Sequence, residues 1–369
     1  AVDLAPFTVL VGPNGSGKSN FADALVFVRE VATDAATALQ RRGGITGVRR
    51  WSRTKPYDVS LSLAASRTRA GLESDFSKHQ VSIKSGREGS WQFHKEVFEV
   101  RRDGALELSI LREGQKLKVD PPQDLFGPED LIPTTSVVVF ARHLMAARSG
   151  PALPRVRRLR LSPELMREPQ VSSNEFRLEE SGKNIAVALS RLQTRQKRRP
   201  IVEPMAQIIP GLLDISTVQV GRYLTLQFVQ MQRGQKAELL ATEMSEGALR
   251  ALGIVVAAHQ MARGELLIVE EPEVHIHPGA ANLIFEILKD AAAKGAVLVT
   301  THSPELLDAA RDEEILVCDY RDGVTSLGPL ASEQRELVRS GLFKVSELMR
   351  SEPLRIEGSR PATIDPGTL

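Results

Sequence analysis

The element around which this sequence is organised is Gly12-Pro13-Asn14-Gly15-Ser16-Gly17-Lys18-Ser19. The apolar run Phe7-Thr8-Val9-Leu10-Val11 precedes it and predicts a buried strand, and Asn20-Phe21-Ala22-Asp23-Ala24-Leu25 follows it and predicts the start of a helix. The spacing is that of a Walker A loop, whose backbone N–H groups surround phosphate oxygens at the amino end of the next helix. The alternative is a glycine-rich turn without a ligand, but the flanking strand and helix are the context that the motif requires.

The polar residues of this loop have expected ligands. Lys18 is expected to reach the β and γ phosphates of a nucleotide, and the Ser19 hydroxyl to hold Mg²⁺. The other residues from Gly12 to Gly17, together with Asn20, are expected to line the phosphates. The sequence therefore predicts a nucleotide site that uses a magnesium ion.

Length and composition indicate a globular chain with more than one lobe. The chain has 369 residues, which favours two or three domains, and its apolar content of 42% and charged content of 25% are near globular averages. The net charge of +2 is close to balanced, but arginines concentrate in 148–199 and carboxylates in 265–314. The basic segment is either a solvated face or a surface for nucleic acid.

The single cysteine, Cys318, follows the apolar run Ile315-Leu316-Val317 and is predicted to be a small buried residue. One cysteine excludes an intrachain disulfide framework and fits a reducing compartment. No apolar run approaches the roughly 18 residues that would span a bilayer, and the amino terminus lacks the pattern of a signal peptide. We therefore expect a cytoplasmic protein without membrane contact.

The rest of the chain predicts further lobes. Because Ala1 stands only a few residues before the first strand, the chain is expected to begin within its sheet. Alternating residues from Tyr57 to Leu117 predict an antiparallel β region, and the segment 155–199 is predicted to be basic and mostly helical, with prolines on its far side. From Glu246 onward, helices alternate with apolar strands, as in a parallel sheet. The predicted domains are 1–120, 121–210, 211–330 and a tail at 331–369.

Carboxylates end one of the later strands, in Leu266-Leu267-Ile268-Val269-Glu270-Glu271-Pro272-Glu273. This is how a Walker B element presents acids at the carboxyl end of a central strand. Glu270 is expected to hold Mg²⁺, directly or through water, and Glu271 to orient the attacking water. The alternative is that these acids cap the next helix.

Two of the segments that follow predicted strands contain histidines. His302, in Thr300-Thr301-His302-Ser303-Pro304, is expected to lie beside Glu271, because adjacent parallel strands end about 5 Å apart. There it could donate to the γ phosphate or to the water; a helix-capping loop is the alternative. His275 and His277 form an H-x-H pair, but no further ligand stands at zinc-binding spacing, so a zinc site is not predicted.

A helix amino terminus opens at Met244-Ser245-Glu246-Gly247, ahead of the Walker B strand. Ser245 is predicted to cap this helix, and Ser245 and Gly247 could also present their N–H groups to a phosphate. If the chain's own phosphate loop is distant, that phosphate belongs to another molecule.

In order, the motifs at 12–19, 245–247, 270–273 and 301–304 resemble those of ABC/SMC-type ATPase heads, and most closely the AAA-21 group, which is related to the heads of OLD-family nucleases. Connecting segments at 42–45, 159–169 and 180–186 extend the resemblance over most of residues 1–308. The resemblance implies an α/β P-loop NTPase fold of ABC ATPase type, with a central, mostly parallel sheet, an antiparallel β subdomain and a helical, Arg-rich subdomain.

The resemblance also implies a mechanism. Two heads would enclose two ATP molecules, with Ser245 and Gly247 acting on the partner's nucleotide and His302 as the switch histidine. This chain has Glu270 where many ABC proteins have Asp, and Ser-Glu-Gly in place of Ser-Gly-Gly, which motivates a hypothesis of slow hydrolysis. Gln92 and Gln123 both remain candidates for the Q-loop glutamine.

Two functions from different classes follow. The leading one is an ATPase whose ATP-bound homodimer acts as a switch or clamp in DNA repair or anti-phage defence, with DNA and a separate nuclease or toxin as possible partners. The other is a regulatory or scaffold subunit that binds ATP to assemble such an effector. A transporter ATPase is disfavoured, because the β region and the basic segment resemble the AAA-21 pattern instead.

Overall fold

The computed structural model describes residues 2–49, 58–67, 75–122, 132–139, 141, 153–192 and 194–358. The chain divides into two compact units. Unit 1 comprises Ala1–Asn20 and Arg157–Leu369, and unit 2 comprises Phe21–Val156. This division differs from the four predicted ranges, because residues 157–210 and the described part of the tail share one apolar core with the phosphate-loop strand.

Unit 1 is built on a six-stranded sheet with the strand order β15-β14-β1-β13-β12-β7. The strands β1, β12, β13 and β14 are parallel, and β15 is antiparallel to β14. These strands are mostly apolar, and β1 is buried at every position, as expected for a parallel sheet that is covered on both faces. Their bounds are β1 Phe7–Val11, β7 Arg155–Leu159, β12 Glu265–Glu270, β13 Ala296–Thr300, β14 Ile315–Arg321 and β15 Val324–Pro329.

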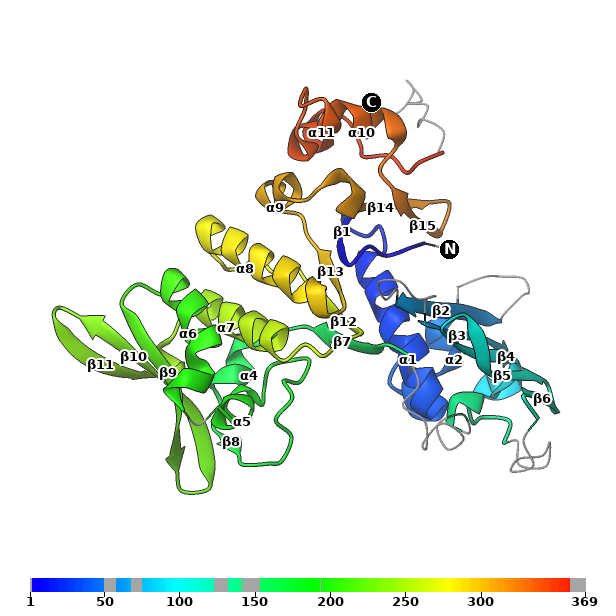
Figure 1. Cartoon of the computed structure of the whole chain (residues 1–369), viewed down its shortest axis with the longest axis horizontal. Helices are drawn as coiled ribbons and strands as arrows, with labels where there is room; N and C mark the ends of the chain where they lie inside the picture. The colour runs from blue at the N-terminus through cyan, green and yellow to red at the C-terminus, as the bar shows by residue number, and fades with distance from the viewer. Residues whose placement is uncertain are drawn as a thin grey trace. The chain divides into compact units, whose positions relative to one another are not determined.

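Helices supply the remaining apolar surface of unit 1. The helix α7 contacts both α6 and α8, and α9 contacts α8 and α11, an arrangement that can be followed in Figure 1. Nearly every residue from Ala248 to Ala258 in α7 is buried, so this helix is the centre of the core. The helices are α4 Pro163–Arg167, α5 Ile185–Ser190, α6 Arg195–Ile208, α7 Glu246–His259, α8 Pro278–Ala291, α9 Pro304–Ala309, α10 Ser332–Arg339 and α11 Val345–Ser351.

A smaller antiparallel sheet also belongs to unit 1. Its central strand β10 pairs with β9 along one side and with β11 and β8 along the other. The bounds are β8 Gln170–Val171, β9 Leu212–Val220, β10 Tyr223–Gln232 and β11 Gln235–Leu240.

The prediction that residues 155–199 are mostly helical is wrong. The segment begins with β7, and between it and α6 only the short α4 and α5 are helical in the described residues. Pro200 and Pro204 do not follow the helical segment but lie inside α6. Buried Ile201 and Met205 on the same helix pack into the core, and this tertiary packing outweighs the local cost of the prolines.

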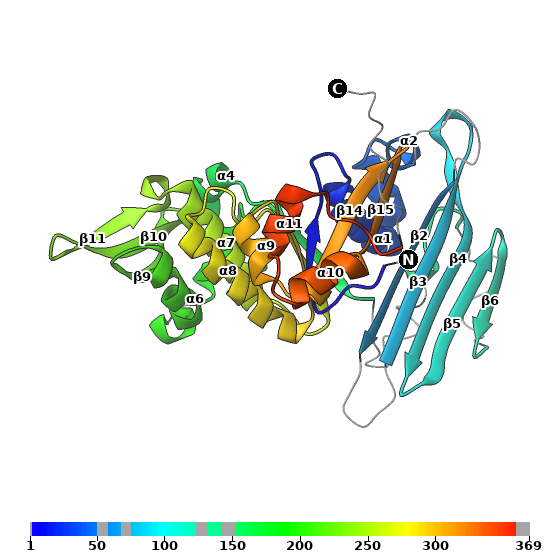
Figure 2. The ribbon, with the colours of Figure 1, turned by 90° about the horizontal axis from the view of Figure 1, so that it is seen from above.

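Unit 2 contains a five-stranded antiparallel sheet in sequence order, β2-β3-β4-β5-β6. Figure 2 shows these strands lying side by side. The helix α1 (Lys18–Gln40) starts in unit 1 and continues into unit 2, where Phe27, Val28 and Val31 share a core with the sheet residues Val81 and Ile83. The other elements are α2 Ile45–Val48, β2 Val59–Arg67, β3 Asp75–Ser85, β4 Trp91–Arg102, β5 Ala105–Glu113 and β6 Lys116–Asp120.

A polar network lies inside unit 2. The fully buried Glu96 accepts from Ser136 Oγ at 2.5 Å and from the Val137 amide at 3.0 Å, and it lies 2.8 Å from His79 Nε2. Arg112, also fully buried, donates to the carbonyls of Ile132 and Thr135. Buried polar groups are tolerated only when paired, so these bonds tie the connection after β6 to the sheet.

The predicted fold class is confirmed as an α/β protein with a mostly parallel central sheet and an antiparallel β region. Within the described ranges, no helix is long and apolar enough to cross a membrane.

Candidate functional site: a phosphate loop beside two acidic strand ends

The predicted motifs meet at one edge of the central sheet. Leu10, near the end of β1, pairs with Thr300 at the end of β13, and Thr300 pairs in turn with Glu270 at the end of β12. The loops that follow these parallel strands therefore leave the sheet side by side. The sheet brings together the phosphate loop, the acids after β12 and the histidine loop after β13.

The phosphate loop is shaped by its glycines. Gly15 and Gly17 have φ angles of +77° and +104°, which other residues rarely adopt. At Gly12, a Cβ would lie 2.1 Å from the Cys318 carbonyl oxygen, so only glycine fits against β14. The Ser16 carbonyl accepts from Thr325 Oγ1 at 2.9 Å and from the buried Cys318 thiol at 3.3 Å, so β14 and β15 support the loop from outside the motif.

Lys18 is buried within this loop. Its Nζ donates to the Gly12 carbonyl at 2.8 Å and to the Pro13 carbonyl at 3.0 Å. Burial lowers the pKa of the Lys18 ammonium, and the nearby Glu271 carboxylate opposes that shift. The loop thus holds a cation where Walker A lysines meet phosphates.

Ser19 and Glu270 are in direct contact. The Ser19 hydroxyl donates to Glu270 Oε2 at 2.8 Å, although 251 positions separate the two residues. A hydroxyl and a carboxylate are oxygen ligands of the kind that Mg²⁺ takes, alongside phosphates. Ser16 Oγ and Glu270 Oε1 are buried without a hydrogen-bond partner in the described residues, which fits a site built to receive further groups. The residues present therefore fit a magnesium nucleotide.

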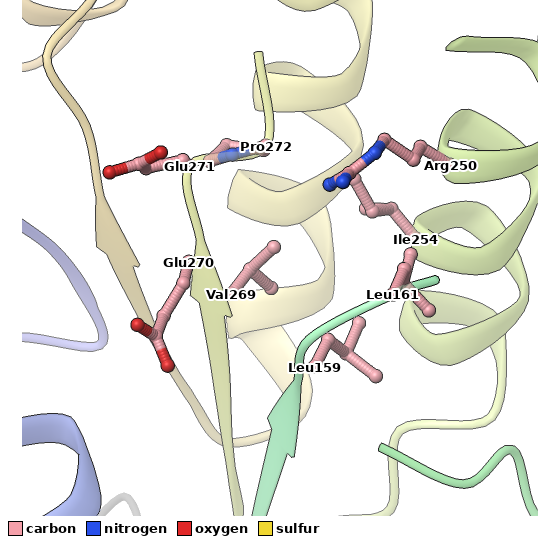
Figure 3. A pocket seen from close by; sticks show the side chains of 8 residues that line it. All are labelled: Leu159, Leu161, Arg250, Ile254, Val269, Glu270, Glu271 and Pro272. Atoms are coloured by element: carbon pink, nitrogen blue, oxygen red, sulfur yellow. The ribbon is translucent and has the colours of Figure 1, made fainter. Parts of the chain in front are cut away.

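Two arginines flank Glu270, and sequence reasoning assigned them no function. Arg160 Nε lies 3.7 Å and Arg158 Nε 3.9 Å from Glu270 Oε1. The signal was the alternation in 158–161, which puts Arg158 and Arg160 on one side of an extended segment and the two leucines on the other. Leu159 and Leu161 line a pocket with Ile254 and Val269, as Figure 3 shows.

Glu271 follows the strand in an unusual conformation. Its φ is +48°, in the left-handed region, and its amide donates to the Thr300 carbonyl at 2.8 Å. In Figure 3 the Glu270 and Glu271 side chains extend to the same side, away from Arg250 of α7. A strained residue at such an edge is typical of functional sites, because the surroundings must compensate its cost.

The histidine loop is held by Glu273, an acid to which the sequence motifs give no role. Glu273 Oε1 accepts from Thr301 Oγ1 at 2.6 Å and from the His302 amide at 3.1 Å. Burial and the positive charge of Lys18 lower the pKa of His302, with Glu271 acting in the opposite direction. His302 thus lies in the same electrostatic environment as Lys18 and Glu271, and its imidazole is favoured in the neutral form.

The start of α7 has the predicted cap. The Ser245 hydroxyl accepts from the Ala248 amide at 3.2 Å. A Cβ on Gly247 would lie 2.2 Å from the His275 carbonyl oxygen, so this glycine is required by packing within the chain. Glu246 pairs with His275 at 2.8 Å, and His277 caps α8. The two histidines of the H-x-H pair thus have separate structural contacts.

Gln92 and Gln123 are the two candidates for the Q-loop glutamine. Gln92 is an exposed residue of β4 in unit 2, and Gln123 lies outside the described residues.

This fold and this arrangement of motifs are those of a P-loop ATPase domain. The chain belongs to the AAA-21 family, whose model is described as "AAA domain, putative AbiEii toxin, Type IV TA system" and matches residues 7–308. The predicted family membership is therefore confirmed. No curated protein matches the chain.

One solved structure of an SMC head shares the fold, and two others have lower TM-scores. The Smc head bound to the C-winged helix domain of ScpA has a TM-score of 0.53 and 14% identity, and the match covers 90% of this chain and 93% of that one. An Smc head with an extended coiled coil, bound to the C-terminal domain of ScpA derived from Pyrococcus furiosus, has a TM-score of 0.48 and 14% identity over 92% and 94% of the two chains. The SMC head domain from Thermotoga maritima has a TM-score of 0.42 and 12% identity over 89% and 92%.

Proposed function

We propose that this protein binds Mg²⁺-ATP and hydrolyses it. The observation that carries the proposal is the contact between Ser19 and Glu270 at 2.8 Å, which joins the phosphate loop to the acidic strand end. The strand pairing of β1, β13 and β12 holds these two residues and Lys18 at one sheet edge. We infer that Lys18 binds the β and γ phosphates, with the loop from Gly12 to Asn20 around them.

The remaining residues have distinct roles in the proposal. Ser19 and Glu270 hold the metal, which supplies charge neutralisation at the transferring phosphate. Glu271 orients and polarises the attacking water, and His302 donates a hydrogen bond to the γ phosphate or to that water. A neutral imidazole can do this because one of its ring nitrogens carries a proton.

We further propose that two copies assemble around ATP. Ser245 is exposed at the amino end of α7, a 14-residue helix whose positive end can bind a phosphate of another copy.

The proposed setting is the cytoplasm, where the ATP-bound dimer serves DNA repair or phage defence. The support is the family's description as a toxin-related AAA domain and the arginine-rich segment at 148–199, part of which lies outside the described residues. DNA is the proposed nucleic-acid partner, and a separate nuclease or toxin the proposed effector. Binding to DNA should weaken steeply with salt if phosphate contacts dominate.

One observation favours the alternative, an ATP-dependent scaffold with slow hydrolysis. Glu246 lies between Ser245 and Gly247, at the helix end proposed to bind the other copy's phosphate, and it pairs with His275. A carboxylate next to the helix end that receives a phosphate adds repulsion, which would slow closure of the dimer. Fast steady-state turnover would contradict this alternative.

The solution mass of Glu271→Gln, with and without Mg²⁺-ATP, tests the proposed function. This change keeps the site's shape while removing the proposed water-activating group, so we expect ATP to raise the mass to that of a dimer. Ser245→Arg in the same background should prevent the increase, because a bulky cation would occupy the phosphate-facing cap. A monomer under all conditions would contradict assembly through Ser245, whereas a dimer without ATP would show constitutive assembly.

A further inference from the structure

A pair of arginines approaches the metal carboxylate without binding it closely. The nitrogens of Arg158 and Arg160 lie 3.9 Å and 3.7 Å from Glu270 Oε1, beyond hydrogen-bonding distance. That oxygen has no hydrogen-bond partner in the described part of the chain, and the Glu270 side chain is only 13% exposed. The carboxylate is therefore partly neutralised by charge but keeps a free oxygen.

The two arginines differ in how firmly they are held. Arg158 is 12% exposed and donates to Glu180 at 2.7 Å, so its guanidinium has a fixed partner. The Arg160 side chain is 60% exposed. Its backbone is nevertheless anchored, since its amide donates to the Glu180 carbonyl at 2.9 Å. The backbone of Arg160 is thus held in place, while its side chain can turn toward solvent.

We propose that Arg160 is a positioning residue that gates the metal site by charge, an inference that rests on the proposed function. With no metal bound, its guanidinium offsets the Glu270 carboxylate at the sheet edge. When a divalent cation binds Glu270, the same guanidinium repels it and turns toward solvent. Arg160 therefore raises the Mg²⁺ concentration at which the nucleotide site fills.

The physical basis is that the interaction of Arg160 with the Glu270 site changes from attractive to repulsive when a divalent cation binds. A carboxylate attracts a guanidinium. A divalent cation bound to that carboxylate carries two positive charges and repels the guanidinium at short range. Because Arg160 is largely exposed, salt should screen the repulsion, with a Debye length of about 10 Å at 0.1 M and about 3 Å at 1 M ionic strength. Removing the charge should therefore favour metal binding, most clearly at low salt.

The test measures binding of a fluorescent, non-hydrolysable ATP analogue against buffered free Mg²⁺. For Arg160→Gln we expect half-maximal binding at a Mg²⁺ concentration lower than wild type by about threefold or more, as Coulomb repulsion at this range predicts. Arg160→Lys keeps the charge and should behave as wild type. The matched control is Arg199→Gln, since Arg199 is 71% exposed and pairs with Glu203 on α6.

The outcomes separate the gate from the proposed function. The gate is supported if the Mg²⁺ concentration for half-maximal binding falls only in Arg160→Gln, and if its difference from wild type becomes smaller at high salt. If wild type binds the analogue in a Mg²⁺-dependent way but Arg160→Gln is unchanged or needs more Mg²⁺, the gate is overturned and the proposed function stands. An equal shift in Arg160→Lys also overturns it, because charge would not be the cause. If wild type binds no analogue at any Mg²⁺ concentration, the proposed function fails and the gate fails with it.

Discussion

The two ends of strand β12 carry the same residue in opposite situations. At the amino end, Glu265 is fully buried, lies 3.0 Å from Arg157 Nε and accepts from Arg177 at 2.9 Å and from the Ala262 amide at 2.8 Å. At the carboxyl end, Glu270 accepts from Ser19 at 2.8 Å, while its nearest arginine nitrogens are 3.7 Å and 3.9 Å away.

This difference separates a structural carboxylate from a ligand-binding one. Glu265 has close partners that join β7, β12 and the segment around Arg177, so its charge is neutralised within the fold. The Oε1 atom of Glu270 lies 3.7 Å from its nearest arginine nitrogen, whereas that of Glu265 lies 3.0 Å from Arg157 Nε, so the charge of Glu270 remains available to a cation. A buried acid is therefore informative about function only after its partners are counted.

Breaking the amino end should have the largest effect on stability. Glu265→Gln keeps the side-chain size but leaves Arg157 and Arg177 without their counter-charge, so we expect a loss of about 3–5 kcal/mol in the free energy of unfolding. Urea denaturation followed by circular dichroism measures this loss. Glu203→Gln, which breaks the exposed pair with Arg199, should change it by less than about 0.5 kcal/mol. Equal effects of the two changes would contradict the structural role of Glu265.

The same substitution at the carboxyl end should separate function from stability. Glu270→Gln should lower Mg²⁺-dependent ATP hydrolysis by about 100-fold, because an amide is a poorer ligand than a carboxylate for a hard dication. Its free energy of unfolding should change by less than about 1 kcal/mol, since no arginine depends on it for a close bond. Hydrolysis and urea denaturation of one preparation check both values. Destabilisation as large as that of Glu265→Gln would remove the contrast between the ends.

A third prediction concerns the packing beyond the carboxyl end. Gly247→Ala would place a Cβ 2.2 Å from the His275 carbonyl oxygen, so we expect a loss of about 1–3 kcal/mol from overpacking. Thermal unfolding measures it. Ser245→Ala, which removes only the cap to the Ala248 amide, should cost about 1 kcal/mol. A fully stable Gly247→Ala would show that the loop after β12 can move away from α7.

The smallest expected effect concerns pH. Burial and Lys18 lower the pKa of His302 below its ordinary value of 6.5, so the folded protein takes up the proton at lower pH than the unfolded chain does. Stability should thus be unaffected by His302 above about pH 6.5 and should decline as pH falls below it. An NMR titration, with His302→Gln for assignment, checks the direction. A pKa above 6.5 would contradict the neutral form proposed for the site.

Much of the carboxyl end could be predicted from local patterns. The phosphate loop, the acids after β12 and the histidine after β13 each follow an apolar strand, and parallel strands end at one edge. The expected neighbours Glu271 and His302 are accordingly linked through the end of β13, since the Glu271 amide donates to the Thr300 carbonyl. The arginines beside Glu270 were missed, because a basic run does not indicate which of its members face inward.

The failures have physical causes. Residues 155–199 were expected to be mostly helical, but Arg157 and Arg158 belong to β7, where pairing along the sheet outweighs local propensity. Pro200 was expected to lie beyond the helix, and buried packing of α6 overrode that expectation. The buried contact of Glu96 with His79 joins strands whose alternation could not reveal a polar core.

The sequence by itself determined the class of site, because a Walker A loop needs only a strand, glycines and a helix that are adjacent in the chain. It also determined the order of the remaining motifs and hence the family. Only the tertiary structure decided which charges meet. Ser19 and Glu270 are 251 positions apart, and Arg160 reaches Glu270 from a third segment. Such contacts depend on strand order and register, which long-range packing selects and no local pattern encodes.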